Sequence, residues 1–347
     1  MDTQNREKLY LVTGASGYVG GRLVRELLND HKKVRIFVRN AQKIRGQAWA
    51  DKVEIVEGNA SNSQDLDRAL AGVHTAYYLL HSINVATDFG DIESAMAKGF
   101  ANSAERQHVQ QIIYLGGIAN DENRSRHLTS RMNTGTQLAS TSVPVLELRA
   151  GIIIGSGSAS FEMLRHLTHR LPIMTTPKWV SNRTQPIAIR DVLYYLRNAA
   201  NLAKPVNRIC DIGGPEVVTY AKMMQKFSEI SGLRKRIIIQ VPVLTPKLSS
   251  LWIGFVTPVP TSLARPLVES LISEVVVDPR KSISDLIPLP PEGLLTVSQA
   301  IELALTRVAE NHVDTRWSDA SFPMAPWQKA QSDPDWAGEL TLKDHRE

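Results

Sequence analysis

The sequence has 347 residues and a mass of 38.5 kDa, so we expect a main domain of about 200 residues and a smaller second one. Hydrophobic residues make up 43% and charged residues 22%, with 21 Gly and 18 Pro, which excludes a disordered, collagen-like or low-complexity protein. The formal net charge of +5 is small for this length and the basic residues are scattered, which favours a small anionic ligand and predicts no nucleic-acid partner.

Cysteine and histidine are too sparse for a disulfide framework or a metal site. Cys210 is the only cysteine, which also favours a reducing compartment. His166 and His169 lie three residues apart, but nothing nearby completes a set of ligands, so we predict no metal. No run reaches the roughly 18 apolar residues of a spanning helix, and we predict a cytoplasmic protein that does not span a membrane.

Short apolar runs alternate with helical patterns from Leu9 to Ile154, which is typical of βαβ units on a parallel sheet. Ser63 is expected to cap a helix that ends near Gly72. The predicted strands are Leu9–Thr13, Val34–Val38, Val53–Val56, Thr75–Leu80, Gln111–Leu115 and Val145–Leu148. These elements predict an α/β fold of the Rossmann type, with a doubly wound parallel sheet.

The pattern changes after Gly151, where Gly and Ser cluster and a further helix follows. Ile209–Ile212 is predicted as one more strand. We assign residues 1–211 to a dinucleotide-binding Rossmann domain, with a cap contribution near residues 155–185, and residues 212–316 to a smaller substrate or cap domain. Residues 317–347 form a tail rich in Trp and Pro, which either wraps on the body or leads towards something absent from this chain.

A glycine-rich turn stands between the first strand and the first helix. Gly14 turns the chain, Gly17 lets the backbone approach a pyrophosphate, and Gly20 lets the helix pack on the strand. The positive end of the helix dipole then meets the negative charge. A tight turn without a ligand is the alternative, but the strand–turn–helix context favours a dinucleotide site. Its predicted contacts are Gly14, Ser16, Gly17, Tyr18, Val19 and Gly20.

The end of the second strand selects the cofactor, because an acidic residue there binds the ribose 2′-hydroxyl of NAD. Here the strand ends in Val38 and Arg39, no carboxylate is available, and the Arg39 guanidinium suits a 2′-phosphate. Arg35 and Lys43 are weaker candidates, and a solvated strand-end charge is the alternative for Arg39. NADP(H) is therefore predicted in preference to NAD(H).

The glycine turn, Arg39, Gly58-Asn59-Ala60, Leu148–Gly155 and Gln185–Asp191 together resemble the atypical, NmrA-like branch of the short-chain dehydrogenase/reductase superfamily, in a bacterial subgroup of NAD(P)H-binding oxidoreductases. The resemblance covers nearly the whole chain. It implies that Asn59 and Ala60 lie at the adenine, with Asn59 where the family usually has Asp. It also implies that Leu79, Leu80 and His81 line the nucleotide, although packing at the strand end is the alternative for the leucines.

The same resemblance implies a catalytic site with changed residues. Reductases of this superfamily use a Ser after the fifth strand, a proton-donating Tyr, and a Lys four residues later. Here Gly116 and Gly117 stand where the Ser is expected, and His127 and Arg131 correspond to the Tyr and the Lys. His127 is the candidate proton donor because imidazole titrates near neutrality, and Arg131 can hold a ribose or phosphate. A helix histidine beside a cofactor-binding arginine is the alternative.

Two further hydroxyls, Thr129 and Ser130, have no base partner visible in the sequence. Residues 248–264 carry no charge, and Pro258 and Pro260 break any spanning helix. This segment fits the wall of an apolar substrate pocket, a membrane-surface or protein contact, or ordinary core of the small domain.

The leading hypothesis is an NADP(H)-binding oxidoreductase that transfers hydride to a small carbonyl or enone-like substrate. The first alternative is a non-catalytic NAD(P)H-sensing or scaffold protein, which the changed Ser, Tyr and Lys positions would permit. The second is a membrane-surface accessory protein that uses residues 248–264. The sequence leaves the oligomeric state open.

Overall fold

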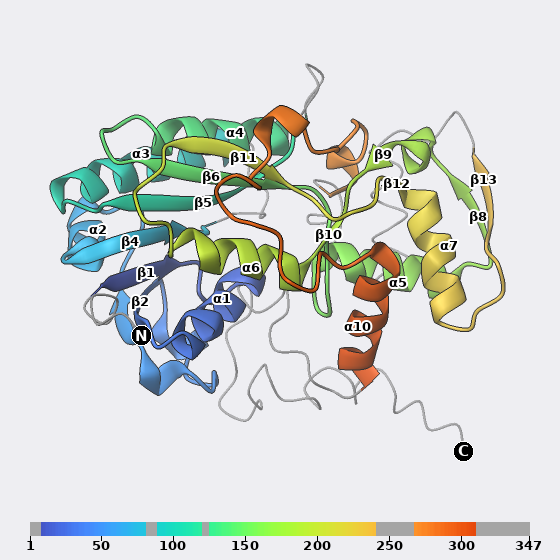
Figure 1. The fold of residues 1–347 in the computed structure, drawn as a ribbon, viewed down its shortest axis with the longest axis horizontal. Helices are drawn as coiled ribbons and strands as arrows, with labels where there is room; N and C mark the ends of the chain where they lie inside the picture. Colours follow the sequence, from blue (N-terminus) through green and yellow to red (C-terminus); the bar gives the residue numbers. More distant parts are fainter. Residues whose placement is uncertain (1–7, 81–88, 120–124, 241–266, 310–347) are drawn as a thin grey trace.

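The computed structural model describes residues 8–80, 89–119, 125–240 and 267–309. A seven-stranded sheet with the order β11-β6-β5-β4-β1-β2-β3 forms its centre (Figure 1), and all neighbouring strands run parallel. The strands are β1 (Leu9–Thr13), β2 (Lys33–Val38), β3 (Glu54–Glu57), β4 (Val73–Tyr78), β5 (Gln111–Gly117), β6 (Val145–Ala150) and β11 (Arg208–Ile212). The predicted Rossmann-type α/β fold is confirmed. The strand order reverses between β1 and β4, where such sheets bind their ligands.

Helices cover both faces of the sheet (Figure 1). One face packs under α1 (Tyr18–Asn29) and α6 (Ile189–Ala199), and the other under α2 (Ser63–Leu70), α3 (Phe89–Arg106) and α4 (Arg126–Leu138). Along β1, Tyr10 and Val12 join the core under α1, whereas Leu9 and Leu11 join the core on the opposite face. The strand is therefore continuously apolar because both of its faces are buried.

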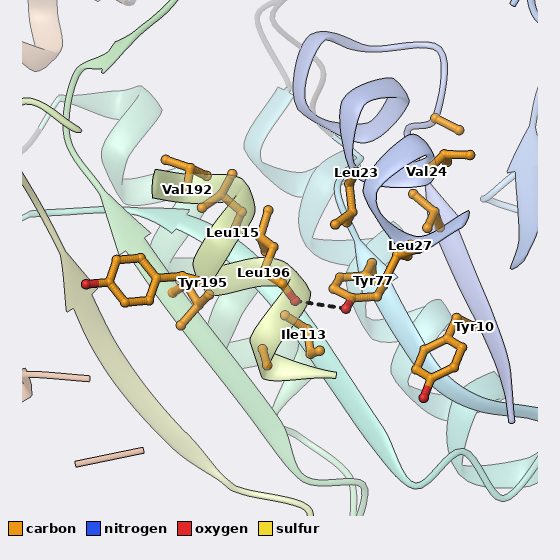
Figure 2. Packing of buried hydrophobic residues seen from close by; sticks show 14 of the residues in the cluster. Tyr10, Leu23, Val24, Leu27, Tyr77, Ile113, Leu115, Val192, Tyr195 and Leu196 are labelled. Atoms are coloured by element: carbon orange, nitrogen blue, oxygen red, sulfur yellow. Dashed lines mark hydrogen bonds between the residues drawn. The ribbon is translucent and has the colours of Figure 1, made fainter. Parts of the chain in front are cut away.

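Tyr77 of β4 fastens the sheet to α6 (Figure 2). Leu23 and Leu27 of α1 pack with Leu196 of α6 in the same core, and Tyr77 lies fully buried among them. Its Oη donates a hydrogen bond to the Leu196 carbonyl at 2.9 Å. Burial raises the pKa of Tyr77 well above its usual value, so the hydroxyl stays protonated and keeps this bond at physiological pH.

Several element boundaries differ from the predicted ones. β4 ends at Tyr78, so Leu79 and Leu80 lie beyond the strand instead of within it. The cap of α2 is Asn62 and not Ser63, because the Asn62 side-chain oxygen accepts hydrogen bonds from the backbone N–H groups of the first turn. β5 and β6 each run two residues further than predicted, because their pairing continues to the register Gly117 opposite Ala150.

A second core lies beyond the carboxyl ends of β5 and β6, at the right of Figure 1. Its helices are α5 (Ala159–Arg170), α7 (Tyr220–Ile230) and α10 (Val297–Ala309). Three two-stranded sheets accompany them: β7 (Ile153–Ile154) with β10 (Ile187–Ala188), β9 (Arg183–Thr184) with β12 (Val218–Thr219), and β8 (Ile173–Thr176) with β13 (Ile237–Gln240). Short 3₁₀ turns are η2 (Ala41–Lys43), η3 (Ala50–Lys52), η4 (Lys178–Ser181) and η5 (Pro279–Lys281). The domain limits at residues 211 and 316 stay predictions.

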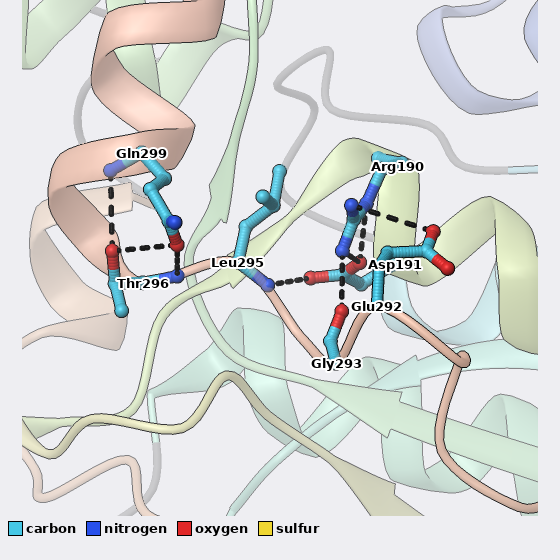
Figure 3. A network of polar contacts seen from close by, with 7 residues as sticks. All are labelled: Arg190, Asp191, Glu292, Gly293, Leu295, Thr296 and Gln299. Atoms are coloured by element: carbon cyan, nitrogen blue, oxygen red, sulfur yellow. Dashed lines mark hydrogen bonds and ion pairs between the residues drawn. The ribbon is translucent and has the colours of Figure 1, made fainter.

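A polar network ties the start of α6 to the chain that leads into α10 (Figure 3). Asp191 is fully buried, and its carboxylate accepts hydrogen bonds from the Leu295 N–H at 2.9 Å and from Arg190 Nε at 2.8 Å. Next along the chain, Thr296 and Gln299 bond each other's backbone and side chain in a capping box before α10. The two cores are thus joined by specific polar contacts as well as by apolar packing.

Three predicted features lie outside the described residues: His81, residues 248–264 and the tail of residues 317–347. Within the described ranges, no helix has both the length and the apolar character needed to cross a membrane. The expected cytoplasmic location stays a prediction.

Candidate functional site

The glycine turn lies at the point where the strand order reverses. Gly14 has a φ of 69°, and a Cβ there would lie 2.5 Å from the Leu79 carbonyl oxygen. A Cβ on Gly20 would lie 2.2 Å from the Gly14 carbonyl oxygen, so both positions need glycine for the fold itself. A Cβ on Gly17 would meet only the Gly14 oxygen, at 3.2 Å, and the remaining space there is open. The packing of the protein therefore demands glycine less strictly at position 17 than at positions 14 and 20.

The first turn of α1 has no side-chain cap. Its N-cap is Gly17, which has no side chain to accept a hydrogen bond, and the first turn contains no acidic residue. Ser16, Tyr18 and Val19 are half-buried. A helix N-terminus without a capping side chain or an acidic residue has a positive dipole end that favours an anion such as a pyrophosphate.

Two side chains that sequence reasoning did not single out hold this turn in place. Thr13 Oγ1 donates to the Tyr77 carbonyl at 3.0 Å and accepts from the Leu79 N–H at 2.9 Å, which locks the ends of β1 and β4 together. Arg22 of α1 lies over the Tyr18 ring at 4.8 Å and donates to the Ser156 carbonyl at 2.9 Å. Tyr18 is thereby held between α1 and the loop that follows β7.

The basic residues around β2 divide into two kinds. Arg35 is buried, donates to the carbonyls of Ala69 and Ala71 at 2.9 and 2.7 Å, and pairs with Glu54 at 2.9 Å. Its guanidinium is committed to joining β2 with α2 and β3, so Arg35 was wrong as a phosphate candidate. Arg39 is exposed just past the end of β2.

Lys43 lies close enough to Arg39 for their charges to interact. Burial lowers the pKa of Lys43, and the positive charge of Arg39 lowers it further. Two cations that repel each other at one exposed edge favour an anion between them. The sequence ranked Lys43 below Arg39, and the structure brings both to the same place.

Asn59 and Ala60 follow β3 on the same edge of the sheet. Asn59 is exposed, its side-chain oxygen accepts from the Ser61 N–H at 3.0 Å, and its own N–H donates to Asp65 at 2.9 Å. An amide oxygen has two lone pairs and its NH₂ group two donors, so Asn59 keeps hydrogen-bonding capacity for an adenine ring. Ala60 is buried in the core next to α2. Leu79 and Leu80 are half-buried just beyond β4.

A cavity of about 200 Å³ lies between the carboxyl ends of β5 and β6 and the second core. It brings together His127 and Arg131 of α4 with Gly116 and Gly117 of β5, all of which the sequence placed at the catalytic centre. Most of the remaining wall is apolar: Leu115, Ile118, Leu128, Ala150, Gly151, Ile152, Ile153, Met163, Leu267, Leu271 and Val275, with Ser160, Ser270 and Tyr220 as further polar groups.

Arg131 is held firmly in this wall. It donates from a terminal guanidinium nitrogen to the Leu115 carbonyl at 2.6 Å, and its own carbonyl accepts from Tyr114 Oη at 3.0 Å. Arg131 Nε is buried without a hydrogen-bond partner in the described part of the chain. Burial raises the pKa of Tyr114 to about 12, so this tyrosine stays neutral and positions α4 instead of donating a proton.

Ser130 has a partner that no local pattern could indicate. Its hydroxyl donates to the carboxylate of Glu93, a buried residue on α3 that lies 37 positions earlier in the chain. Glu93 also lines a small second cavity together with Arg131. Ser130 is therefore engaged in joining α3 to α4.

Glu147 explains why glycine replaces the expected serine. Glu147 and Arg149 form a buried ion pair on β6, with Nε and Oε1 2.6 Å apart. A Cβ on Gly116 would lie 2.7 Å from Glu147 Oε1, and one on Gly135 of α4 would lie 2.4 Å from Oε2. The Glu147 side chain occupies the volume that a serine at position 116 would need.

No group of three or more His, Cys, Asp or Glu side chains in the described ranges could hold a metal ion. His166 lies 3.5 Å from Glu162, one turn away on α5, and His169 packs edge-on against Phe227 with ring centroids 5.7 Å apart. The histidine pair therefore serves packing and charge pairing within the second core.

A doubly wound parallel sheet with a glycine turn at its reversal point defines a dinucleotide-binding protein. Residues 14–141 match the model of the family described as NAD(P)H-binding, and the predicted resemblance to the atypical, NmrA-like short-chain dehydrogenases/reductases is confirmed.

Similar proteins of known name or structure cover most of the chain. The ceramide reductase of Caulobacter vibrioides is 24% identical over 232 residues, which are 65% of this chain and 72% of that protein. The structure of Citrobacter sp. triphenylmethane reductase superimposes with a TM-score of 0.67 at 19% identity, covering 86% of this chain and 99% of that one. The NADPH-dependent quinone oxidoreductase of Escherichia coli gives a TM-score of 0.65 at 17% identity, covering 84% and 98%. The two structural likenesses show a shared fold.

Proposed function

We propose that the protein is an NADPH-dependent reductase that transfers hydride to a small, apolar carbonyl or enone-like substrate. The observation that carries the proposal is the cavity of about 200 Å³, in which His127 and Arg131 lie with apolar side chains at the carboxyl ends of β5 and β6. The NAD(P)H-binding family match and the reductase names of the similar proteins support it.

Residues along the carboxyl edge of the sheet would hold the cofactor. The N-terminus of α1, which has no side-chain cap, suits the pyrophosphate, and the exposed Arg39, helped by Lys43, suits a 2′-phosphate. Asn59 suits the adenine, and Leu79 is placed to cover the nucleotide. This arrangement, with no acidic residue directly after β2, is why we propose NADP(H) in preference to NAD(H).

His127 is proposed as the proton donor and Arg131 as the residue that orients the cofactor ribose. When bound, NADPH supplies the hydride that reduces the substrate carbon. His127 then gives its proton to the substrate oxygen, and solvent returns a proton to the imidazole. The fixed guanidinium of Arg131, anchored at Leu115, keeps the ribose in one place.

The substrate is proposed to be apolar because the wall of the cavity is apolar. Ile152, Met163 and Leu271 contribute side chains that cannot hydrogen-bond. An apolar cavity of about 150 Å³ takes benzene, so the present one suits a ring or a short chain of similar size. The name of the similar Caulobacter protein, ceramide reductase, fits an apolar substrate of which one part enters the cavity.

The test is NADPH oxidation, followed by absorbance, with a panel of quinones, enones and aldehydes for wild type, His127→Ala and Arg131→Ala. We expect His127→Ala to lower turnover by ~10²- to 10⁴-fold, the usual contribution of general acid catalysis, with little change in NADPH affinity. Arg131→Ala is expected to weaken both. If His127→Ala leaves turnover unchanged, another group donates the proton, and the proposal of a reductase still holds.

The rival proposal is a protein that senses or scaffolds on NAD(P)H without turnover. The observation in its favour is Glu147, which fills the place of the usual serine and leaves the cavity without that hydroxyl. Wild-type protein that binds NADPH tightly, yet oxidises it no faster than buffer with every compound, would favour this rival. A membrane-surface or protein contact through residues 248–264 remains a separate proposal to be tested with lipid vesicles.

A further inference from the structure

Tyr220 is the first residue of α7 and lines the cavity. The residue is only 2% exposed, and its Oη is buried without a hydrogen-bond partner among the described residues. Buried polar groups in folded proteins almost always have a partner, so one that lines a cavity points to a ligand or a water as the missing partner. Burial raises the pKa of Tyr220, so its hydroxyl stays protonated and can donate.

A second donor without an acceptor lies against the first. The Trp179 ring meets the Tyr220 ring edge-on, with centroids 5.5 Å apart, and Trp179 Nε1 is also buried without a partner in the described ranges. An indole N–H can only donate. Trp179 is not among the residues that line the cavity, so within the described ranges the Tyr220 hydroxyl is the unpaired donor that an oxygen atom in the cavity can reach.

We propose that the Tyr220 hydroxyl recognises an oxygen acceptor of the substrate, so that the substrate carries a second oxygen besides the carbonyl that is reduced at His127. The inference rests on the proposed function and narrows its substrate class to apolar molecules with two oxygen acceptors, such as a para-quinone or a hydroxy ketone. Tyr220 is a binding and specificity residue in this scheme, because its hydroxyl remains protonated throughout.

The variant Tyr220→Phe removes only the hydroxyl. Because this hydroxyl has no protein partner to lose, the variant is expected to fold with an unchanged or slightly higher melting temperature. Tyr195→Phe is the matched control, since Tyr195 is an equally buried tyrosine that lies in the first core (Figure 2) and does not line the cavity.

The binding test compares cyclohexane-1,4-dione, which carries two oxygens, with cyclohexanone, which carries one. We expect Tyr220→Phe to lower the ratio of their affinities by about 3- to 10-fold relative to wild type, the effect of one neutral hydrogen bond, and Tyr195→Phe to leave it unchanged. An unchanged ratio in Tyr220→Phe would overturn the inference and leave a buried water as the partner.

The kinetic test uses para-benzoquinone, with two oxygens, and cyclohexenone, with one. Tyr220→Phe is expected to raise KM for the quinone about 3- to 10-fold with kcat nearly unchanged, and to affect cyclohexenone less. Equal effects on both substrates would contradict a second oxygen site. If none of the compounds causes wild type to oxidise NADPH, the proposed reduction is wrong. If the affinity ratio still falls in Tyr220→Phe, the oxygen site is supported independently of the reduction.

Discussion

The roles of several residues in this protein depend on contacts with residues that are far away in the chain. Glu147 occupies the volume next to Gly116, and the buried Glu147 pairs with Arg149 at 2.6 Å. A buried ion pair is tolerated only when both partners are present, since removal of one leaves an uncompensated charge. A serine at position 116 would therefore require the Glu147–Arg149 pair to move.

At the same scale, Arg39 is expected to set cofactor preference. Loss of a charged hydrogen bond weakens binding by ~1.5–3 kcal/mol, so Arg39→Ala should weaken NADPH by roughly 10- to 100-fold and leave NADH nearly unchanged. Titration calorimetry with both cofactors measures the two affinities. Equal loss for NADPH and NADH would contradict a contact with the 2′-phosphate, and Lys43→Ala should show the same selectivity with a smaller effect.

The helices α1 and α2 differ in how their N-termini are capped. α2 begins at a side-chain cap and is followed by Gly72 with a φ of 72°. α1 begins at Gly17 without such a cap, and this is the helix whose end faces the proposed pyrophosphate. The contrast has a physical reason, because a side-chain cap on α1 would occupy the donors that an anion needs.

The cap of α2 can be tested directly. Asn62→Ala is expected to destabilise the protein by ~0.5–2 kcal/mol, because the N–H groups of Gln64 and Asp65 lose their acceptor. Ser63→Ala, one residue further on, is the control and should have little effect, since Ser63 is not the cap. Urea unfolding followed by circular dichroism gives both values, and a larger loss for Ser63→Ala would contradict the assignment.

In the described part of the molecule the sheet has an apolar core on each face, and the cavity lies where the sheet meets the second core. Asp191 and Arg190 connect the start of α6 with the chain before α10, and the cavity lies between the sheet and α5 and α7. Hydride transfer to an apolar substrate requires a site that excludes water, and a junction between two packed cores provides one. The stability of this junction is therefore linked to the shape of the site.

The contribution of Asp191 to the stability of this junction depends on pH. Burial raises its pKa, partly offset by the Leu295 N–H and by Arg190, so the native state holds this proton more tightly than the unfolded state does. The contribution of Asp191 to stability is present in full below its unfolded pKa and is lost as pH rises through its folded pKa. We expect the free energy of unfolding of wild type minus that of Asp191→Asn to fall as pH rises above about 4, the unfolded pKa of an aspartate.

Asp285 provides a control of the opposite sign. Its hydrogen bond with Arg208 lowers the pKa of its exposed carboxyl, so its contribution is present above the unfolded pKa and is lost as pH falls. The corresponding difference for Asp285→Asn should therefore rise with pH, and this rise should occur at about pH 4 and below. Parallel urea titrations of the three proteins measure both differences, and slopes of equal sign would refute the assignment of Asp191.

The sequence by itself determined the parallel sheet, the glycine turn and the basic residue past β2, because these depend on local spacing and on the period of apolar residues. Only the tertiary structure decided that Arg35 is structural, that Ser130 bonds Glu93, and that Tyr220 lines the cavity with His127. Each of these facts joins residues far apart in the chain. Their contacts arise only when strands, helices and the second core pack together, and no local pattern in one sequence records that packing.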